Sequence, residues 1–378
     1  MNVRWNSKDF KIGVLGGGQL GRMLIQEAVD LDIRLHMMDA DPNAPCADIA
    51  HSFTCGSITN FDSVMEFGKD KDLITVEIEN VNIEALEALE ETGIKIYPQP
   101  RVLRIIKDKG IQKQFYLDNA IPTAPFQLFK DSDAVANENL SYPLIQKMRT
   151  GGYDGKGVQI LKNASESFNA PNLCESLIDF EKELSIIVAR NQNGAIECFP
   201  SVECEFNPEA NLVEYLFSPA SISAETAKEA MKIAEDVIKK LDMVGLLAVE
   251  FFLTKNGDLL VNEIAPRPHN SGHHTIECCN TSQYAQHLRS ILNLPLGDTT
   301  LLFPGAMINL LGEKGYNGPV IYDGLDKILE LPGVHPHIYG KSETKPFRKM
   351  GHVTITGKTL QEVRKTADQV KEKIKVLA

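Results

Sequence analysis

The chain has 378 residues, and its 51 Asp and Glu outnumber its 39 Lys and Arg, which gives a formal net charge of −12. This charge argues against nucleic acid or an anionic membrane as the main partner. The length predicts two or three domains, and 43% hydrophobic residues are enough for sizeable cores. Seven cysteines without a CxxC pair, a first segment without an apolar signal region and the lack of a long apolar run predict a reduced, cytoplasmic protein outside the membrane.

The N-terminal region is typical of a βαβ unit. Strands are predicted over residues 11–15 and 33–38, with an amphipathic helix between them. Three glycines after the first strand match the dinucleotide fingerprint, and an acidic residue stands near the ribose-binding position: Gly16, Gly18 and Gly21, with Asp39 or Asp41. A nicotinamide-dependent oxidoreductase is therefore one hypothesis. The same turn can equally hold another phosphate or anion.

The next strand is predicted over residues 73–78 and carries Glu77 and Glu79 at its end. Open α/β sheets bind ligands at the carboxyl ends of their strands, so either glutamate can reach a substrate. The alternative is that both are exposed at the sheet edge. A helix over residues 83–91 and a strand over 94–97 complete this region.

A β-hairpin is predicted where two apolar runs, 246–254 and 259–264, flank the sequence Lys-Asn-Gly-Asp. Asn-Gly favours a two-residue type I′ turn. Counting from that turn pairs Lys255 with Asp258, Phe252 with Val261 and Glu250 with Glu263.

Two carboxylates directly opposite each other repel unless a positive charge lies between them. Glu250 and Glu263 therefore predict a site for Mg²⁺, which prefers one or two carboxylates together with substrate phosphates. Asn262 is expected on the other face of the strand unless a bulge turns it. The alternative is an ordinary solvated strand face with two unrelated glutamates.

The segment 265–274 follows this hairpin and contains two prolines and a glycine, which exclude a regular helix or a central strand. We predict a shaped loop that displays an arginine, an asparagine, a serine and three histidines toward substrate. Zinc binding by His269 and His273 is disfavoured, because no other Cys or His pair has matching spacing.

A second polar region precedes the hairpin. A helix is predicted over residues 108–119, with basic side chains that include Lys113, and a strand over 143–147 ends in Lys147. Four glycines between residues 151 and 157 predict a mobile flap whose backbone can approach a polyphosphate. It is not a Walker motif, because GxxxxGK[ST] is absent from the sequence.

The remaining elements are predicted mainly to form the core. They are an antiparallel set over residues 186–213, helices over 224–241 and 282–291, and strands at 174–178 and 305–311. A basic turn lies between the segments 334–341 and 345–353. The last helix is predicted to carry one apolar face that continues to Ile374 and Leu377.

Three segments together resemble the ATP-grasp superfamily, and within it the 5-(carboxyamino)imidazole ribonucleotide synthases of purine biosynthesis: GGGQLGRM (16–23), TGGYDGKG (150–157) and NEIAPRPHNSGHH (262–274). The resemblance runs from Lys11 to the C-terminus. It implies an α/β fold with an N-terminal Rossmann-like domain (1–107), a small α+β central lid (108–184) and a C-terminal ATP-grasp domain (185–378). It also implies a homodimer.

The resemblance implies that ATP and Mg²⁺ activate bicarbonate as carboxyphosphate, which the amine of 5-aminoimidazole ribonucleotide then attacks. A sister ATP-grasp ligase that uses formate, or a biotin carboxylase-like enzyme, remains an alternative, as does a module that binds nucleotide without turnover. Phe206 departs from the family, because many relatives have a histidine there.

Site residues follow from the same resemblance, position by position. For ATP they are Lys109, Lys147, Gly152, Tyr153, Asp154, Gly155, Lys156, Gly157, Val158, Glu175, Ser176, Leu177, Ile178, Glu183, Asn262 and Glu263, and for the metal Glu250 and Glu263. For catalysis they are Asp154, Arg267, His269 and Asn270, and for the ribonucleotide Gly18, Gln19, Leu20, Glu77, Lys341 and Arg348, the last two on its phosphate.

Overall fold

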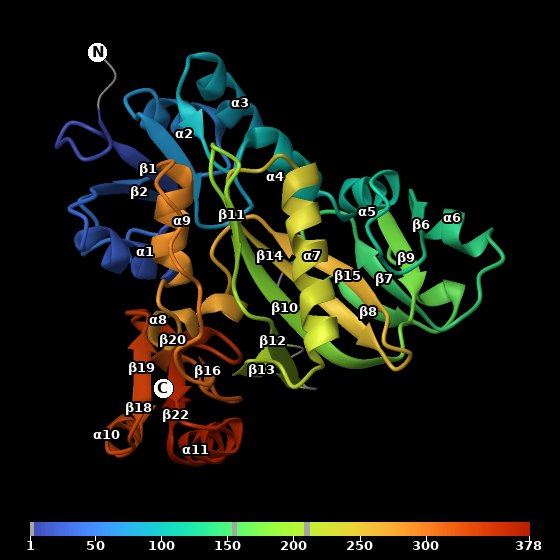
Figure 1. Cartoon of the computed structure of the whole chain (residues 1–378). Coiled ribbons are helices and arrows are strands. Elements are labelled where there is room, and N and C mark those ends of the chain that lie inside the picture. Colours follow the sequence, from blue (N-terminus) through green and yellow to red (C-terminus); the bar gives the residue numbers. More distant parts are fainter. Residues whose placement is uncertain (1–3, 153–156, 208–211) are drawn as a thin grey trace.

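The computed structural model describes residues 4–152, 157–207 and 212–378. The first part is a five-stranded parallel sheet with strand order β3-β2-β1-β4-β5 (Figure 1). Its strands are β1 (Ile12–Leu15), β2 (Leu35–Asp39), β3 (Ser52–Cys55), β4 (Leu73–Val76) and β5 (Lys95–Ile96), and its helices are α1 (Gln19–Val29), α2 (Phe61–Gly68) and α3 (Ile83–Glu91). The predicted βαβ start is confirmed.

The strand order of this sheet reverses at β1, which has β2 on one side and β4 on the other. Every residue of β1 and β4 is buried, as expected for central strands covered on both faces. The turn at Gly16–Gly18 leaves the carboxyl end of β1, and Glu77 follows the end of β4. Both therefore lie at the crevice where doubly wound sheets bind ligands.

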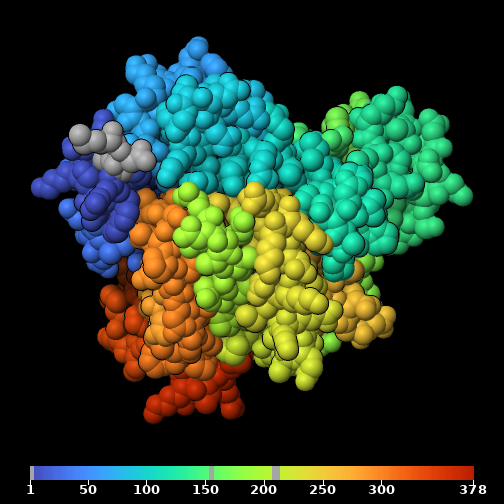
Figure 2. Space-filling view, turned by 45° about the horizontal axis from the view of Figure 1, so that its top comes forward, coloured from blue at the N-terminus to red at the C-terminus, as the bar shows by residue number. Residues whose placement is uncertain are grey.

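A small antiparallel sheet follows, with strand order β6-β9-β7-β8. It is reached through α4 (Pro100–Lys107) and α5 (Lys109–Asp118), and consists of β6 (Phe126–Phe129), β7 (Leu144–Met148), β8 (Val158–Leu161) and β9 (Asn172–Ser176), with α6 (Ser132–Ala136) and η1 (Ala164–Glu166). This part projects from the body of the molecule (Figure 2). The strand predicted over 174–178 ends earlier, at Ser176.

A nine-stranded antiparallel sheet forms the largest part, with strand order β15-β14-β10-β12-β13-β16-β21-β19 and β11 paired to β10. Its strands are β10 (Phe180–Arg190), β11 (Ile196–Cys198), β12 (Val202–Asn207), β13 (Leu212–Ser218), β14 (Gly245–Thr254), β15 (Leu259–Ala265), β16 (Gly305–Leu311), β19 (Val334–Ile338) and β21 (Lys349–Thr356). Because β10 begins at Phe180, it runs across the domain boundary expected at 184/185, and that division stays a prediction.

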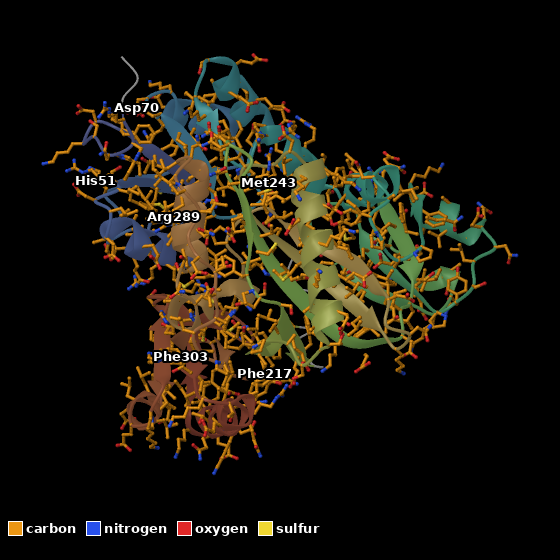
Figure 3. All side chains as sticks on the ribbon, in the orientation of Figure 1. His51, Asp70, Phe217, Met243, Arg289 and Phe303 are labelled. Atoms are coloured by element: carbon orange, nitrogen blue, oxygen red, sulfur yellow. The ribbon has the colours of Figure 1, made fainter. Side chains whose placement is uncertain are left out.

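Two helices cover this sheet at different places. α7 (Ala224–Lys240) follows its N-cap Ser223, whose side chain accepts a hydrogen bond from the Thr226 amide, and it packs with β10 and β14 around the largest apolar core. α11 (Leu360–Lys373) packs on β16 and β21, and Phe217, labelled in Figure 3, belongs to that second core. The guanidinium of Arg364 lies 3.6 Å above the Phe217 ring.

The last helix is shorter than predicted. It ends at Lys373, and β22 (Lys375–Leu377) pairs with β18 (Ile321–Asp323), so Ile374 and Leu377 do not continue the helix. The backbone has turned to an extended conformation at Ile374. The other small elements are β17 (Gly318–Pro319), which pairs with β20 (Glu343–Thr344), α8 (Thr275–Cys278), α10 (Leu325–Leu329) and η2 (Asn270–Gly272).

α9 (Gln283–Ile291) joins the N-terminal sheet to the large sheet (Figure 1). It packs on α1 on one side and on β10 and β14 on the other. Buried His287 on this helix lies 2.9 Å from the hydroxyl of Thr75 on β4. Within the described residues, every helix is too short or too polar to span a bilayer.

Candidate active site

The hairpin of β14 and β15 places Glu250 opposite Glu263, as predicted, but by a different route. The turn is not type I′, because Asn256 does not have a positive φ and only Gly257 does. Thr254 pairs with Asp258 instead, and near the turn Phe252 faces Leu260 rather than Val261. The predicted Lys255–Asp258 and Phe252–Val261 pairs are therefore wrong.

The pairing near the turn is offset by one residue from the predicted register, and a β-bulge just before Glu263 restores it. The register shifts between Glu250 and Phe251, and the extra residue on β15 is Asn262. The bulge turns the Asn262 side chain toward the lid, where its Oδ1 accepts a hydrogen bond of 2.8 Å from Nζ of Lys147. The sequence alone predicted Asn262 on the far face in the absence of such a bulge.

The two glutamates differ in charge state. Burial in the cleft, and after it the nearby Glu263 carboxylate, raise the pKa of Glu250 to about 7. Burial also opposes ionisation of Glu263, but the ammonium group of Lys109 forms an ion pair with it and brings its pKa below the ordinary value. Glu183, on the neighbouring strand β10, has its pKa raised to about 7 by burial and then by Glu250.

This arrangement fits a divalent cation by the chemistry of its donors. Glu250 and Glu263 face each other on the hairpin, and Glu183 lies close enough to Glu250 for that carboxylate to raise the cost of ionising Glu183 beyond that of burial. Within the described residues, no three His, Cys, Asp or Glu side chains stand close enough together to hold a metal ion on their own, so the pair Glu250 and Glu263 is the candidate site for a cation that also binds phosphate. Lys109 forms an ion pair with Glu263, and Nε2 of His269 lies 3.7 Å from a Glu250 oxygen. An added cation would favour the ionised form of all three glutamates.

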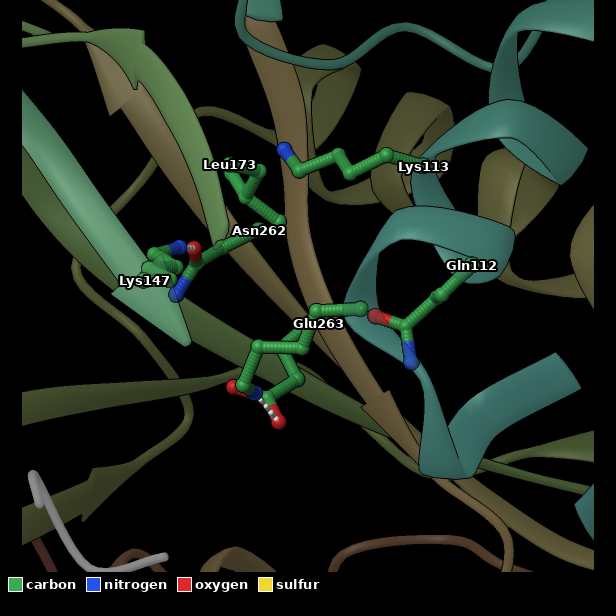
Figure 4. A pocket seen from close by; sticks show the side chains of 7 residues that line it. Gln112, Lys113, Lys147, Leu173, Asn262 and Glu263 are labelled. Atoms are coloured by element: carbon green, nitrogen blue, oxygen red, sulfur yellow. Dashed lines mark hydrogen bonds and ion pairs between the residues drawn. The ribbon is translucent and has the colours of Figure 1, made fainter. Parts of the chain in front are cut away.

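Lysines from the lid and α5 form the opposite wall of this cleft (Figure 4). The buried carboxylate of Glu175 forms ion pairs with Lys147 and with Lys113, the latter at 2.8 Å. Burial opposes ionisation of Glu175, but the two ammonium groups bring its pKa below the ordinary value. The resemblance implied an adenine-side role for Glu175, whereas here it holds two lysines.

Lys113 and Gln112 line this pocket together with Lys109, Lys147 and Glu263, although no role was predicted for either residue from the sequence. A signal for Lys113 was available, because it lies four residues after Lys109 and so on the same face of α5. Asp108 starts that helix by accepting hydrogen bonds from the amides of Gly110 and Ile111. The helix start is what points Lys109 at the hairpin.

The flap can be followed only in part. Gly152, Gly157 and Val158 are described, and Gly157 has φ +75°, a backbone conformation that suits glycine. The backbone amide of Met148 donates to the Gly157 carbonyl at 2.8 Å, which closes the base of the β7–β8 hairpin. The predicted residues Tyr153, Asp154, Gly155 and Lys156 lie outside the described residues.

The remaining nucleotide-side residues lie near the junction of the lid and the large sheet. Ser176 ends β9, and its amide donates to the Pro125 carbonyl at 3.0 Å. Leu177 and Ile178 then connect β9 to β10, and the Leu177 side chain is exposed. Phe206 lies on β12 at a register shift opposite Val213.

The loop 265–274 contributes some of its predicted side chains to the cleft. Arg267 forms an ion pair of 2.8 Å with Glu79, and His269 Nε2 lies 3.7 Å from a Glu250 oxygen. Asn270 starts the short helix η2 beside them. The prediction that all three histidines are displayed is wrong, because His273 and His274 are buried and pack into the interior.

The glycine-rich first turn is occupied by a side chain. Glu77 accepts a hydrogen bond of 3.1 Å from the Leu20 amide, and a Cβ on Gly18 would lie only 2.6 Å from its Oε1. Asp39 accepts from the Gly17 amide instead of projecting toward a ribose. Carboxylates thus stand where a dinucleotide pyrophosphate would approach. Burial raises the Glu77 pKa to about 7, although the cation of Arg267 opposes that shift.

Lys341 belongs to the same neighbourhood, because its charge also acts on the Glu77 carboxyl. Its Nζ donates to the Lys349 carbonyl at 2.7 Å and lies 5.6 Å from the centre of the Tyr339 ring. Arg348 donates to the Glu343 carbonyl at 2.6 Å on the following turn. The structure thus brings Glu77, Arg267 and Lys341 together from three distant parts of the sequence.

Comparison with protein families agrees with this geometry. Residues 10–107 match a ribonucleotide synthetase preATP-grasp domain, residues 114–284 an ATP-grasp domain and residues 305–366 a phosphoribosylaminoimidazole carboxylase C-terminal domain. A chloroplastic phosphoribosylaminoimidazole carboxylase of Vigna aconitifolia is 39% identical over 93% of the chain. The chain spans 65% of the length of that plant protein.

Solved structures cover the chain more completely. N5-carboxyaminoimidazole ribonucleotide synthetase from Thermotoga maritima is 40% identical, with a TM-score of 0.90 over 98% of this chain and 99% of that one. The Aspergillus clavatus N5-carboxyaminoimidazole synthase, solved with ADP and 5-aminoimidazole ribonucleotide, is 31% identical, with a TM-score of 0.88 over 97% and 98%. The chain therefore belongs to the N5-carboxyaminoimidazole ribonucleotide synthase family of ATP-grasp ligases.

Proposed function

We propose that this chain uses ATP to join bicarbonate to the amine of 5-aminoimidazole ribonucleotide, giving N5-carboxyaminoimidazole ribonucleotide, ADP and phosphate. The observation that carries the proposal is the meeting of two unlike sites at one loop. A lysine-lined, carboxylate-rich cleft suited to a polyphosphate lies on one side, and the Glu77–Arg267–Lys341 group lies on the other. The Aspergillus relative was solved with ADP and this ribonucleotide.

At the phosphate end, Lys109 and Lys147 would meet the ATP phosphates, with Lys113 behind them. Each lysine holds a carboxylate or amide oxygen in the free protein, so ATP would replace part of these contacts. Mg²⁺ would be held by Glu250 and Glu263, with Asn262 beside them, and its charge would offset that of the phosphates.

The first chemical step is phosphoryl transfer. A bicarbonate oxygen attacks the γ-phosphorus of ATP, the bond to the bridging β,γ oxygen breaks, and ADP leaves with that electron pair. The chain's part is to align the two anions, which lysines do by cancelling charge. Arg267, which pairs with Glu79, and His269, which lies beside Glu250, are proposed to hold the bicarbonate end.

In the second step the substrate amine attacks the carboxyl carbon of carboxyphosphate, the bond from that carbon to the bridging oxygen breaks, and phosphate leaves with the electron pair and takes up the proton that the amine loses. If carboxyphosphate first breaks into phosphate and carbon dioxide, the amine attacks the carbon dioxide and the same phosphate takes up the proton. Carboxyphosphate hydrolyses readily, so the site must exclude water, and the segment 150–158 is proposed to act as the flap that does this. Glu77 with Gly18, Gln19 and Leu20 would contact the ribonucleotide, and Lys341 with Arg348 its phosphate. Asp154 and Asn270 keep the catalytic roles that the resemblance implies, and the homodimer stays a prediction.

The test is phosphate release from ATP with bicarbonate and 5-aminoimidazole ribonucleotide added singly and together, followed by detection of the carbamate product. We expect rapid phosphate release, and formation of the carbamate product, only when bicarbonate and 5-aminoimidazole ribonucleotide are both present. Formate in place of bicarbonate separates this activity from that of a formate-using sister ligase. Release with formate, or ATP binding without release under all conditions, would contradict the proposal.

A further inference from the structure

The acceptor side of the cleft is built from two segments that do not pair with each other. One is the loop 265–274, whose backbone is fastened to α9: the Gln283 side-chain amide bonds both the amide and the carbonyl of His269 at 2.8 Å. The other is the strand pair β19–β21 with the turn that carries Lys341. A clamp on one ribonucleotide needs these two segments in a fixed relation.

Three imidazole rings connect them in a stack. The ring centre of His273, from the loop, lies 4.5 Å from that of His352 on β21, and His352 lies 4.4 Å from His337 on β19 with an angle of 9° between the planes. His337 and His352 are direct cross-strand partners. His273 and His352 are buried.

Each ring of the stack has a specific polar partner. The Tyr284 hydroxyl, from α9, lies 3.0 Å from Nδ1 of His273, and the Tyr339 hydroxyl lies 3.0 Å from Nδ1 of His352. His337 Nε2 lies 2.7 Å from a Glu277 oxygen on α8. The partners therefore come both from the helices α8 and α9 next to the loop and from the strand pair β19–β21 with its turn, and each ring has a defined orientation.

We propose that the His273–His352–His337 stack is a positioning element for the acceptor substrate, which holds the loop 265–274 and the Lys341 turn at the separation that the ribonucleotide requires. The inference rests on the proposed function. His352 does not touch the reacting atoms: it acts through Tyr339, whose ring lies under the Lys341 ammonium and whose amide bonds the Met350 carbonyl at 3.1 Å.

The contact works between uncharged rings. Burial lowers the pKa of both His273 and His352 well below the ordinary value, and the neighbouring imidazoles and Lys349 act in the same direction on His273. Neutral rings can stack face to face, whereas two imidazolium rings at this distance would repel. Nδ1 of each ring meanwhile satisfies a buried tyrosine hydroxyl, which an aliphatic side chain would leave unpaired.

The test compares three variants of the stack in steady-state kinetics and in direct binding of 5-aminoimidazole ribonucleotide. His352→Phe keeps a flat ring but removes Nδ1, and we expect it to raise KM for the ribonucleotide about tenfold while KM for ATP changes less than about twofold. Tyr339→Phe removes the other partner of that hydrogen bond and should give a similar shift, without adding to His352→Phe. His352→Asn keeps an acceptor near the Nδ1 position but removes the ring from the stack, so it should also raise KM for the ribonucleotide and leave KM for ATP nearly unchanged.

The matched control is His287→Phe, a buried histidine with one side-chain partner that lies outside the stack. It should lower the melting temperature and leave both KM values unchanged. Equal rises of KM for ATP and ribonucleotide in His352→Phe, or a loss of stability alone, would overturn the inference. If His352→Phe does not fold, Tyr339→Phe and His352→Asn decide it by the same readouts. Wild-type protein without ribonucleotide-dependent turnover would instead refute the proposed function, and this inference with it.

Discussion

The two ends of the cleft are held together by opposite means. At the phosphate end, Lys109 forms an ion pair with Glu263 of the hairpin, and Lys147 of the lid contacts Glu175 and Asn262. At the acceptor end, buried neutral imidazoles and tyrosine hydroxyls set the geometry. Charged contacts can be exchanged for those of a ligand, whereas a stacked, buried cluster is fixed in advance. This difference predicts that nucleotide binding rearranges the contacts at the phosphate end, whereas the acceptor end keeps the same geometry with and without substrate.

The largest effect is expected from Glu263→Gln. The change removes a proposed metal ligand and the partner of Lys109, so turnover should fall about a hundredfold or more. The measurement is phosphate release at saturating and at limiting Mg²⁺. Glu235→Gln on the exposed face of α7, which loses only an ion pair with Lys239, is the control and should retain wild-type rates. Unchanged turnover of Glu263→Gln at limiting Mg²⁺ would remove this residue from the site.

The next effect tests whether the lysine wall is exchangeable. Glu175→Gln leaves Lys113 and Lys147 buried without their shared anion, and the free energy of unfolding should fall by about 3 kcal/mol in the absence of nucleotide. Urea unfolding with and without Mg²⁺-ATP measures it. If phosphates replace the lost charge, ATP should stabilise the variant more than the wild type. Equal ATP stabilisation, together with lost preference for adenine, would favour the adenine-side role instead.

A smaller effect tests the acceptor end. Arg348→Ala and Lys341→Ala should each weaken the apparent affinity for 5-aminoimidazole ribonucleotide by about 1.5–3 kcal/mol, the range for a lost charge-assisted hydrogen bond to a phosphate, while KM for ATP stays near normal. Lys345→Ala is a nearby control outside the proposed contacts. Equal losses for both substrates, or none for either, would show that the phosphate is held elsewhere.

How far the sequence determined these sites depends on the kind of contact. The opposition of Glu250 and Glu263 follows from strand alternation, but it survives here because a three-residue turn and a bulge at Asn262 cancel. Counting could not detect either deviation. The Gly16–Gly18 turn was recognisable, yet only the fold shows that Glu77 closes it.

The histidines of the loop 265–274 also show that the burial of a side chain could not be predicted from the local sequence. A loop with two prolines correctly predicted irregular structure, but composition could not tell partly buried His269 from fully buried His273, four residues later. That difference arises from contacts with Tyr284 and His352, 11 and 79 positions further along the chain. Long-range packing of this kind has no local signal in a single sequence.

The smallest effect concerns pH and separates the carboxylates at the phosphate end from the rest of the molecule. Glu250 has a folded-state pKa of about 7 against an ordinary value of 4.5, so between these values the folded chain binds more protons than the unfolded chain. The contribution of Glu250 to the free energy of unfolding is therefore fully present below pH 4.5, and it is lost as the pH rises through 7. Other carboxyls with lowered pKa values, such as Glu175, act in the opposite direction, so the informative quantity is the difference between wild type and Glu250→Gln.

Without nucleotide, we expect Glu250→Gln to gain stability relative to wild type by about 1–2 kcal/mol between pH 5 and pH 7.5, a figure reduced for partial solvent access. Mg²⁺-ATP should reverse the sign, because a bound cation favours the ionised wild-type carboxylate and the amide cannot supply that charge. Urea unfolding of both proteins at four pH values, with and without Mg²⁺-ATP, gives the two curves. A difference independent of pH in both conditions would mean that Glu250 is ionised throughout, and that the charge at this end of the cleft is already balanced before any ligand binds.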